Sequence, residues 1–171
     1  MREMNGTSND SSPRNLTRDK TRGNLLVAVQ FILLIGLVIL PTGTLWPYPE
    51  WLAISALILM LGGVMVVLFS LVALGKAATA TPVPKEGAPL RTTGLYALVR
   101  HPIYSGLLAA GLGLALRGGS VWHILVFIAL IVLLSLKSRW EERMLMGVHP
   151  EYKSYAARVG RFVPGIGTLK N

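Results

Sequence analysis

Apolar and polar stretches alternate along the chain on the length scale of membrane helices. Residues 24–41 form a first apolar run, which is near the lower limit for crossing roughly 30 Å of hydrocarbon. Residues 51–75 form the longest run and predict a second membrane helix. Two shorter runs, 103–117 and 120–137, follow a polar connection. The pattern predicts an all-α integral membrane protein with about four membrane segments.

The last two apolar runs predict a short helical hairpin that need not cross the bilayer completely. The stretch RGGS at 117–120 favours a tight reversal, and Ser120 is a good N-cap for the returning helix. Small residues four positions apart along the first arm would let another helix approach closely. These pairs are Gly106 and Ala110, Ala109 and Gly113, and Gly111 and Ala115.

Polar segments at the two ends of the chain flank the apolar runs, which are expected to belong to one membrane domain. Residues 1–23 are rich in Asn, Ser, Thr and Arg and are expected to be a disordered tail. Residues 24–171 are expected to form a single domain whose C-terminal tail, 138–171, contains an amphipathic helix. The first apolar run is interpreted as an uncleaved anchor and not a signal peptide, because no small-x-small cleavage site follows it.

The amino-acid composition indicates what kind of molecule the chain contacts. The 171 residues are 52% hydrophobic, with a mean hydropathy of +0.54 and a formal net charge of +9. The basic residues lie between apolar runs and not on one soluble face, which favours anionic headgroups over nucleic acid as the partner. The chain has no cysteine and only three scattered histidines, so no thiolate chemistry and no metal site are expected.

The distribution of Lys and Arg predicts the orientation. Five lie in residues 1–23, none in the turn after the first run, four in the connection 76–102, one in the hairpin turn and seven from Lys137 onward. Positive-inside counting puts both termini and the 76–102 connection in the cytoplasm. The short loops favour a bacterial inner membrane as the location.

The stretch VRHPIYSG places charge at the start of a membrane helix. Pro102 suits the first helical position, and the N–H groups of residues 103–105 would then be free to bind a carboxylate or a phosphate. The alternative is that Arg100 and His101 only mark a helix start at headgroup level.

Two adjacent carboxylates, Glu141 and Glu142, would extend from the second hairpin arm to the membrane face where Pro102 lies. They could pair along the helix, Glu141 with Lys137 and Glu142 with Arg139. They could instead bind the ammonium group of a ligand. The residues alone leave both readings open.

Three segments carry a resemblance to a known family. GLYALVRHPIYSG, EERML and HPEYKSYAARVGRFVPG occur in order between about residues 88 and 165. Together they resemble the isoprenylcysteine carboxyl methyltransferase and phospholipid methyltransferase superfamily. The resemblance implies an integral membrane enzyme that uses S-adenosylmethionine and methylates a membrane lipid or another lipophilic acceptor taken from the lipid side.

The resemblance also implies site residues, and the chemistry of the residues themselves adds Glu142, Arg139 and the role of His101. Those expected to bind the cofactor are Tyr96, His101, Pro102, Ile103, Tyr104 and Glu141, with Glu142 as a second candidate for the cofactor's ammonium. His101 is expected to orient the cofactor or to relieve the acceptor of a proton. Lys137 and Arg139 are expected to bind substrate. Lys137 stands where prenylcysteine-methylating members have arginine. A lysine cannot form the bidentate hydrogen bonds with a carboxylate that an arginine forms.

Two other functions remain open. One is a non-catalytic membrane relative of the family, and the other is an NADPH-dependent reductase of the sterol-reductase type. The reductase would need more helices and more basic contacts than this chain offers. The stretch GLGLALRGG lacks the glycine spacing of a dinucleotide fingerprint and follows no strand.

Overall fold

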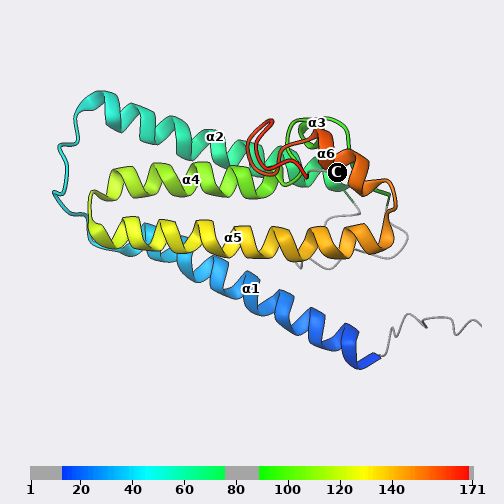
Figure 1. The fold of residues 1–171 in the computed structure, drawn as a ribbon. Helices are drawn as coiled ribbons and strands as arrows, with labels where there is room; N and C mark the ends of the chain where they lie inside the picture. Colours follow the sequence, from blue (N-terminus) through cyan, green and yellow to red (C-terminus); the bar gives the residue numbers. More distant parts are fainter. Residues whose placement is uncertain (1–12, 76–88, 170–171) are drawn as a thin grey trace, which may run out of the picture.

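The computed structural model describes residues 13–75 and 89–169, which are helical apart from their connecting loops (Figure 1). The helices in these ranges are α1 (Pro13–Ile39), α2 (Glu50–Leu74), α3 (Leu95–Leu98), α4 (Pro102–Gly118), α5 (Val121–Val148) and α6 (Tyr152–Arg158). Within the same ranges no strand forms, and extended backbone meets only in isolated bridges. The predicted all-α class is confirmed.

The long helices α1, α2, α4 and α5 run side by side and alternate in direction (Figure 1). Helix α4 packs on α2, α5 and α1, and α1 also packs on α5. The short helices α3 and α6 gather at one end of the bundle, beside the start of α4 and the C-terminal end of α5 (Figure 1). This end of the bundle carries most of the polar side chains discussed below.

Three helices of the described residues are long and apolar enough to cross a membrane: the Asp19–Ile39 part of α1, α2 and α5. Helix α4 has 17 residues, about 26 Å, which is shorter than the roughly 30 Å of a hydrocarbon core. The chain is therefore a membrane protein. The count of four crossing segments stays a prediction.

The first helix begins earlier than predicted. Helix α1 starts at Pro13, so residues 13–23, expected to be disordered, are helical. Proline at the first helical position is compatible with a helix start, and the next residue that disfavours a helix is Gly23. Residues 1–12 of the expected tail, and residues 76–88 of the expected cytoplasmic connection, lie outside the described residues.

The second arm of the hairpin is not short. Helix α5 continues past Lys137, the predicted end of the membrane segment, and past Glu142, to which the helix was expected to reach, and ends at Val148. Its 28 residues extend about 42 Å. The sequence KSRWEERMLM contains strong helix formers and no glycine or proline, so the helix leaves the apolar zone without ending. The first part of the expected C-terminal tail is therefore helical, and it carries both Glu141 and Glu142.

Small residues form the contact between α2 and α4, as predicted. A Cβ atom added at Gly106 would lie 2.5 Å from the carbonyl oxygen of Gly63, and one at Gly113 would lie 2.5 Å from that of Ala56. Glycine at these places lets the two backbones come within van der Waals contact. Gly111 faces α5 instead, where an added Cβ would lie 3.1 Å from Leu130.

The hairpin turn is closed by capping at both helices. Gly119 ends α4 with φ 55° and ψ 29°, a left-handed conformation that favours glycine. The Ser120 side chain accepts a hydrogen bond from the N–H of His123, which confirms Ser120 as the N-cap of α5. The turn is fixed to the α1–α2 loop, since the N–H of Gly43 donates to the carbonyl of Gly118 at 2.8 Å.

Candidate active site

Backbone hydrogen bonds join the start of α4 to the segment that follows α6. Val99 forms a parallel bridge with Gly160. The N–H of Arg100 donates to the carbonyl of Gly160 at 2.8 Å, and the N–H of His101 donates to the carbonyl of Arg161 at 3.1 Å. The C-terminal segment thereby fixes the extended stretch from which the Arg100 and His101 side chains project.

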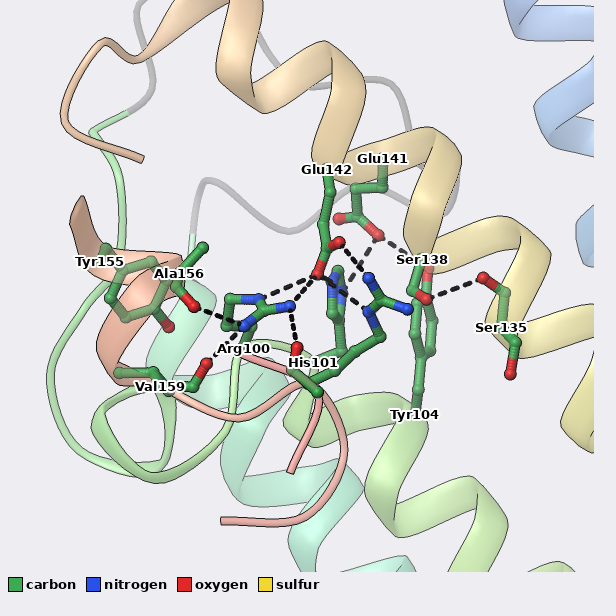
Figure 2. Close-up of polar contacts among 12 residues, drawn as sticks. Arg100, His101, Tyr104, Ser135, Ser138, Glu141, Glu142, Tyr155, Ala156 and Val159 are labelled. Atoms are coloured by element: carbon green, nitrogen blue, oxygen red, sulfur yellow. Dashed lines mark hydrogen bonds and ion pairs between the residues drawn. The ribbon is translucent and has the colours of Figure 1, made fainter. Parts of the chain in front are cut away.

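Glu142 lies at the centre of a buried ion-pair network (Figure 2). Its Oε1 accepts hydrogen bonds from Arg100 Nε at 2.9 Å and from Arg161 Nε at 3.2 Å, and lies 3.2 Å from His101 Nε2. Its Oε2 accepts from Arg161 Nη2 at 2.8 Å. Both carboxylate oxygens are therefore used inside the protein, and the side chain is only 3% exposed.

Arg100 connects this network to the chain's C-terminal part. Its guanidinium donates to the carbonyl oxygens of Ala156 at 3.0 Å and Gly167 at 2.9 Å, and also to that of Val159. The side chain is completely buried. A buried charge must have all its donors satisfied to be tolerated, and Arg100 meets that condition by holding three backbone carbonyls and Glu142 together.

Glu141 differs from its neighbour, although both lie on the same turn of α5 (Figure 2). Its Oε2 accepts a hydrogen bond from the Tyr104 hydroxyl at 2.9 Å and lies 3.5 Å from His101 Nδ1. Its side chain is 27% exposed and lines a cavity. Within the described residues its other oxygen, Oε1, has no partner, so Glu141 can accept a further hydrogen bond from a ligand.

His101 is held by aromatic contacts and at both of its ring nitrogens. Its ring stacks on Tyr104 at 5.3 Å between centroids, and the edge of Phe162 contacts it. Burial lowers the pKa of His101, but hydrogen bonds and charge from Glu141 and Glu142 outweigh that effect. The pKa of His101 is therefore raised above 6.5, which favours the charged imidazolium near neutral pH.

Two tyrosines beside the network remain neutral. The Tyr155 hydroxyl donates to the backbone carbonyl of Tyr96 at 2.5 Å. Burial raises the pKa of Tyr96 to about 12, with the charge of Glu141 as a second cause, and burial also raises the pKa of Tyr155 to about 12. Tyr96, which is among the residues that line the cavity, is therefore protonated at physiological pH.

A cavity of about 340 Å³ opens beside Glu141, between the helices of the bundle. One side, here called the polar half, is formed by the α3–α4 region and α5. Its polar residues are Tyr96, Arg100, His101, Tyr104, Lys137 and Glu141, and its apolar residues are Pro102, Ile103 and Leu107. The other half is formed by α1 and α2 and is apolar except for Gln30. Its residues are Val27, Gln30, Phe31, Leu34, Val67, Leu71 and Leu74.

Lys137 lies deeper along α5 than Glu141 and is 3% exposed. Its Nζ donates to Gln30 Oε1 on α1 at 2.8 Å and lies 5.1 Å from the centre of the Tyr104 ring. The helix pairing considered from the sequence, Lys137 with Glu141, is not formed, and Glu142 pairs with arginines from other segments, not with Arg139. Arg139 is exposed.

The structure brings most of the expected site residues to the cavity. Those that line it are Tyr96, His101, Pro102, Ile103, Tyr104, Lys137 and Glu141. Glu142 and Arg139 are not among the lining residues. One further expectation was wrong: the N–H of Ser105 is not free, because it donates to the carbonyl of His101 at 3.0 Å. Among the described residues no side chain caps α4, so the first-turn N–H groups at 103 and 104 have no side-chain partner there.

Sequence reasoning missed three residues of the site: Gln30, Arg100 as a buried ion-pair partner, and Arg161. Gln30 had a signal, since it interrupts an apolar run that is otherwise suited to lipid. Arg161 lies inside the third segment of the resemblance, HPEYKSYAARVGRFVPG, but nothing in that segment indicates a buried ion pair with Glu142. His123 lies at the opposite end, where its Nδ1 is 2.8 Å from Ser120 Oγ, and has no part in the site.

Comparison with known families identifies the chain. A family model described as phospholipid methyltransferase matches residues 51–151, from the start of α2 to the residue before α6. The match includes α2, for which the sequence offered only compatible hydropathy, and it leaves out α1 and Arg161. No curated protein matches the chain significantly. Since the matched residues make up more than half of the sequence, the chain belongs to the phospholipid methyltransferase family.

Proposed function

We propose that the protein is an S-adenosylmethionine-dependent methyltransferase that acts on a lipophilic acceptor, in the manner of isoprenylcysteine carboxyl methyltransferases. Family membership gives the coarser statement, a membrane methyltransferase for lipid-like substrates. The observation that carries the proposal is the two-sided cavity. Its polar half suits a charged cofactor, and its apolar half, formed by membrane helices, suits a lipid chain.

The residues of the polar half fit the cofactor's amino-acid end. Glu141 Oε1 is available for an ammonium group, and the N–H groups at 103 and 104 lie at the positive end of α4, where a carboxylate is favoured. Tyr96 and Tyr104 add hydroxyl groups beside Glu141. Bound there, S-adenosylmethionine supplies a methyl group activated by its sulfonium.

His101 is proposed to act by orientation. Its ring is fixed by Tyr104, Phe162 and the two glutamates, so it offers a rigid wall to the cavity. A methyl displacement needs alignment and exclusion of water more than it needs proton transfer, and a fixed wall supplies both. With Glu142 buried away from the cavity, Glu141 is the carboxylate we propose for cofactor binding.

Lys137 is proposed to hold the polar end of the acceptor. It is buried, lines the cavity and lies where the apolar walls from α1 and α2 meet the polar half. Phe31 and Leu71, on the two walls, are 56% and 42% exposed, so they face both the cavity and the surrounding lipid. A lysine binds a carboxylate as a point charge without a fork, which favours acceptors other than the prenylcysteine carboxylate.

The proposed location is a bacterial inner membrane with the site facing the cytoplasm. The end of the bundle that holds the site also receives the N-terminal start of α1 and the C-terminal segment (Figure 1). Residues 13–23 and 138–169 contain nine of the 17 Lys and Arg, whereas the opposite end has Arg117 alone between the two loops. Positive-inside counting supports this orientation.

The direct test is cofactor binding by the full chain in lipid nanodiscs, measured by calorimetry with S-adenosylmethionine and, separately, with NADPH. We expect S-adenosylmethionine to bind and Glu141→Gln to weaken binding about tenfold or more, since a hydrogen bond between charged groups is lost. Glu151→Gln, at a carboxylate that is 59% exposed, is the matched control and should bind as the unaltered protein does. Binding of NADPH alone would favour the reductase, and binding of neither would favour a non-catalytic relative.

A further inference from the structure

Arg161 lies in the C-terminal segment, beyond the residues that the family model matches, and pairs with Glu142 of α5 without being among the residues that line the cavity. We propose that Arg161 is a positioning residue, which by pairing with Glu142 holds that carboxylate in place and limits how strongly it keeps a proton on His101. The inference concerns the charge of His101 and does not depend on which cofactor the cavity binds.

Arg161 and Glu142 form a bidentate ion pair. Arg161 Nη2 lies 2.8 Å from Glu142 Oε2 and Arg161 Nε lies 3.2 Å from Oε1. Two-point pairing of a guanidinium with a carboxylate fixes the carboxylate plane as well as its position. Because Oε1 also faces His101 Nε2 at 3.2 Å, the orientation of that plane decides how well the imidazole is held.

Charges of both signs surround His101, and each charged residue has a definite effect on its protonation. Glu141 lies at Nδ1, Glu142 lies at Nε2, and both favour the imidazolium. Arg100 and Arg161 oppose it indirectly, because each neutralises part of the charge on Glu142. The stacked Tyr104 is hydrogen-bonded to Glu141 and carries no charge of its own into this balance.

The backbone holds Arg161 in place. Its N–H donates to the carbonyl of Ile166 at 2.8 Å, and its carbonyl accepts from the N–H of His101 at 3.1 Å. The preceding residue, Gly160, has no room for a side chain, since an added Cβ would lie 2.8 Å from the backbone nitrogen of Gly165. Arg161 therefore reaches Glu142 from a turn that is itself hydrogen-bonded to the residue it is proposed to control.

This arrangement predicts the direction in which the pKa of His101 changes in each variant. Removing the positive charge of Arg161 leaves Glu142 less neutralised, so His101 should hold its proton more strongly and its pKa should rise. Removing the negative charge of Glu142 should lower the pKa of His101. A mutation that only loosened the site would instead move His101 toward the ordinary value near 6.5.

The experiment is a pH titration of the histidine side chains by nuclear magnetic resonance, using the full chain with ¹⁵N-labelled histidine in nanodiscs. The chain has three histidines, so His101→Gln assigns the His101 signal. The variants are Arg161→Gln, Glu142→Gln and the matched control Arg158→Gln, an exposed arginine three residues earlier. We expect Arg161→Gln to raise the His101 midpoint by about half a pH unit or more, Glu142→Gln to lower it, and Arg158→Gln to leave it unchanged.

Arg161→Lys adds a rescue test, because it keeps the charge and should return the midpoint most of the way to that of the unaltered protein. If Arg161→Gln does not fold, Arg161→Met replaces it in the same comparison. A His101 midpoint that falls or stays constant without Arg161 would overturn the proposal. Calorimetry with S-adenosylmethionine on the same samples keeps the two hypotheses apart, since the titration result stands whether or not the cofactor binds.

Discussion

The α2–α4 interface and the Glu142 network stabilise the same bundle in opposite ways. At the interface, Gly63, Gly106 and Gly113 remove side chains so that two apolar helices meet at backbone distance. At the network, charged side chains from two separate segments, residues 100–101 and Arg161, converge on one buried carboxylate of α5. An atom added at the interface would overlap the facing backbone, whereas a charged side chain removed from the network would leave a buried charge without its partner. Membrane helices use the first device to associate, and the second to hold the irregular ends that form a site.

The largest expected effect breaks the interface. Gly63→Val should destabilise the bundle by about 4 kcal/mol or prevent folding, because even the Cβ would overlap the backbone of Gly106. Its neighbour Gly62 has nothing within 4 Å of an added Cβ and provides the control. Gly62→Val should change stability little. Denaturant unfolding in mixed micelles measures both, and equal losses at the two positions would contradict the packing described.

A second change breaks the network. Arg100→Met leaves Glu142 with less compensation in a buried site and removes the donors that hold three carbonyls, so a loss of about 3 kcal/mol is expected. Arg143→Met, at an exposed arginine one residue after Glu142, is the control and should cost far less. The same unfolding assay compares them. A loss at Arg100 no larger than at Arg143 would mean that the network contributes nothing to stability.

The pH dependence of stability distinguishes the two regions, because the network contains titratable side chains and the glycine interface contains none. The pKa of His101 is raised in the folded protein, so its contribution is complete below the ordinary value near 6.5 and is lost as pH rises through the folded value. Between the two values stability should fall by up to about 1.4 kcal/mol per pH unit. His101→Gln should flatten that part of the profile. A profile that is unchanged by His101→Gln would contradict the raised pKa.

The smallest effect lies at the turn opposite the site. Ser120→Ala removes the N-cap of α5 and its contact with His123, at an expected cost of about 1 kcal/mol. Ser154→Ala, where an exposed serine donates to the carbonyl of Glu151, is the comparison and should cost less. Cofactor affinity should be the same in both variants. A change in cofactor affinity with Ser120→Ala would mean that the two ends of the bundle are coupled.

The interface could be predicted from sequence because its information is local. Small residues four apart on one helix indicate a close helix contact wherever the partner lies. Glu141 and Glu142 could not be told apart in the same way. They are adjacent and chemically identical, and their roles differ because one points to the cavity and the other toward Arg100 and Arg161.

The length of α5 shows a second limit of sequence reasoning. The membrane segment was expected to end at Lys137, where the apolar run ends, and residues 137–142 were expected to continue its helix. Helix propensity continues through the charged stretch, so α5 carries Glu141 beyond Lys137 on one continuous helix. Gln30 reaches the site from α1, more than a hundred residues away in the chain, and no local pattern pairs it with Lys137.

The most direct test of the central claim is transfer of a labelled methyl group. Membranes containing the full chain are incubated with S-adenosylmethionine carrying a tritiated methyl group and then extracted with organic solvent. We predict label in the lipid extract above that of membranes lacking the protein, reduced at least tenfold by Glu141→Gln and retained by Glu151→Gln. No transfer above the membrane background, or transfer equal in both glutamate variants, would contradict a methyltransferase site at Glu141.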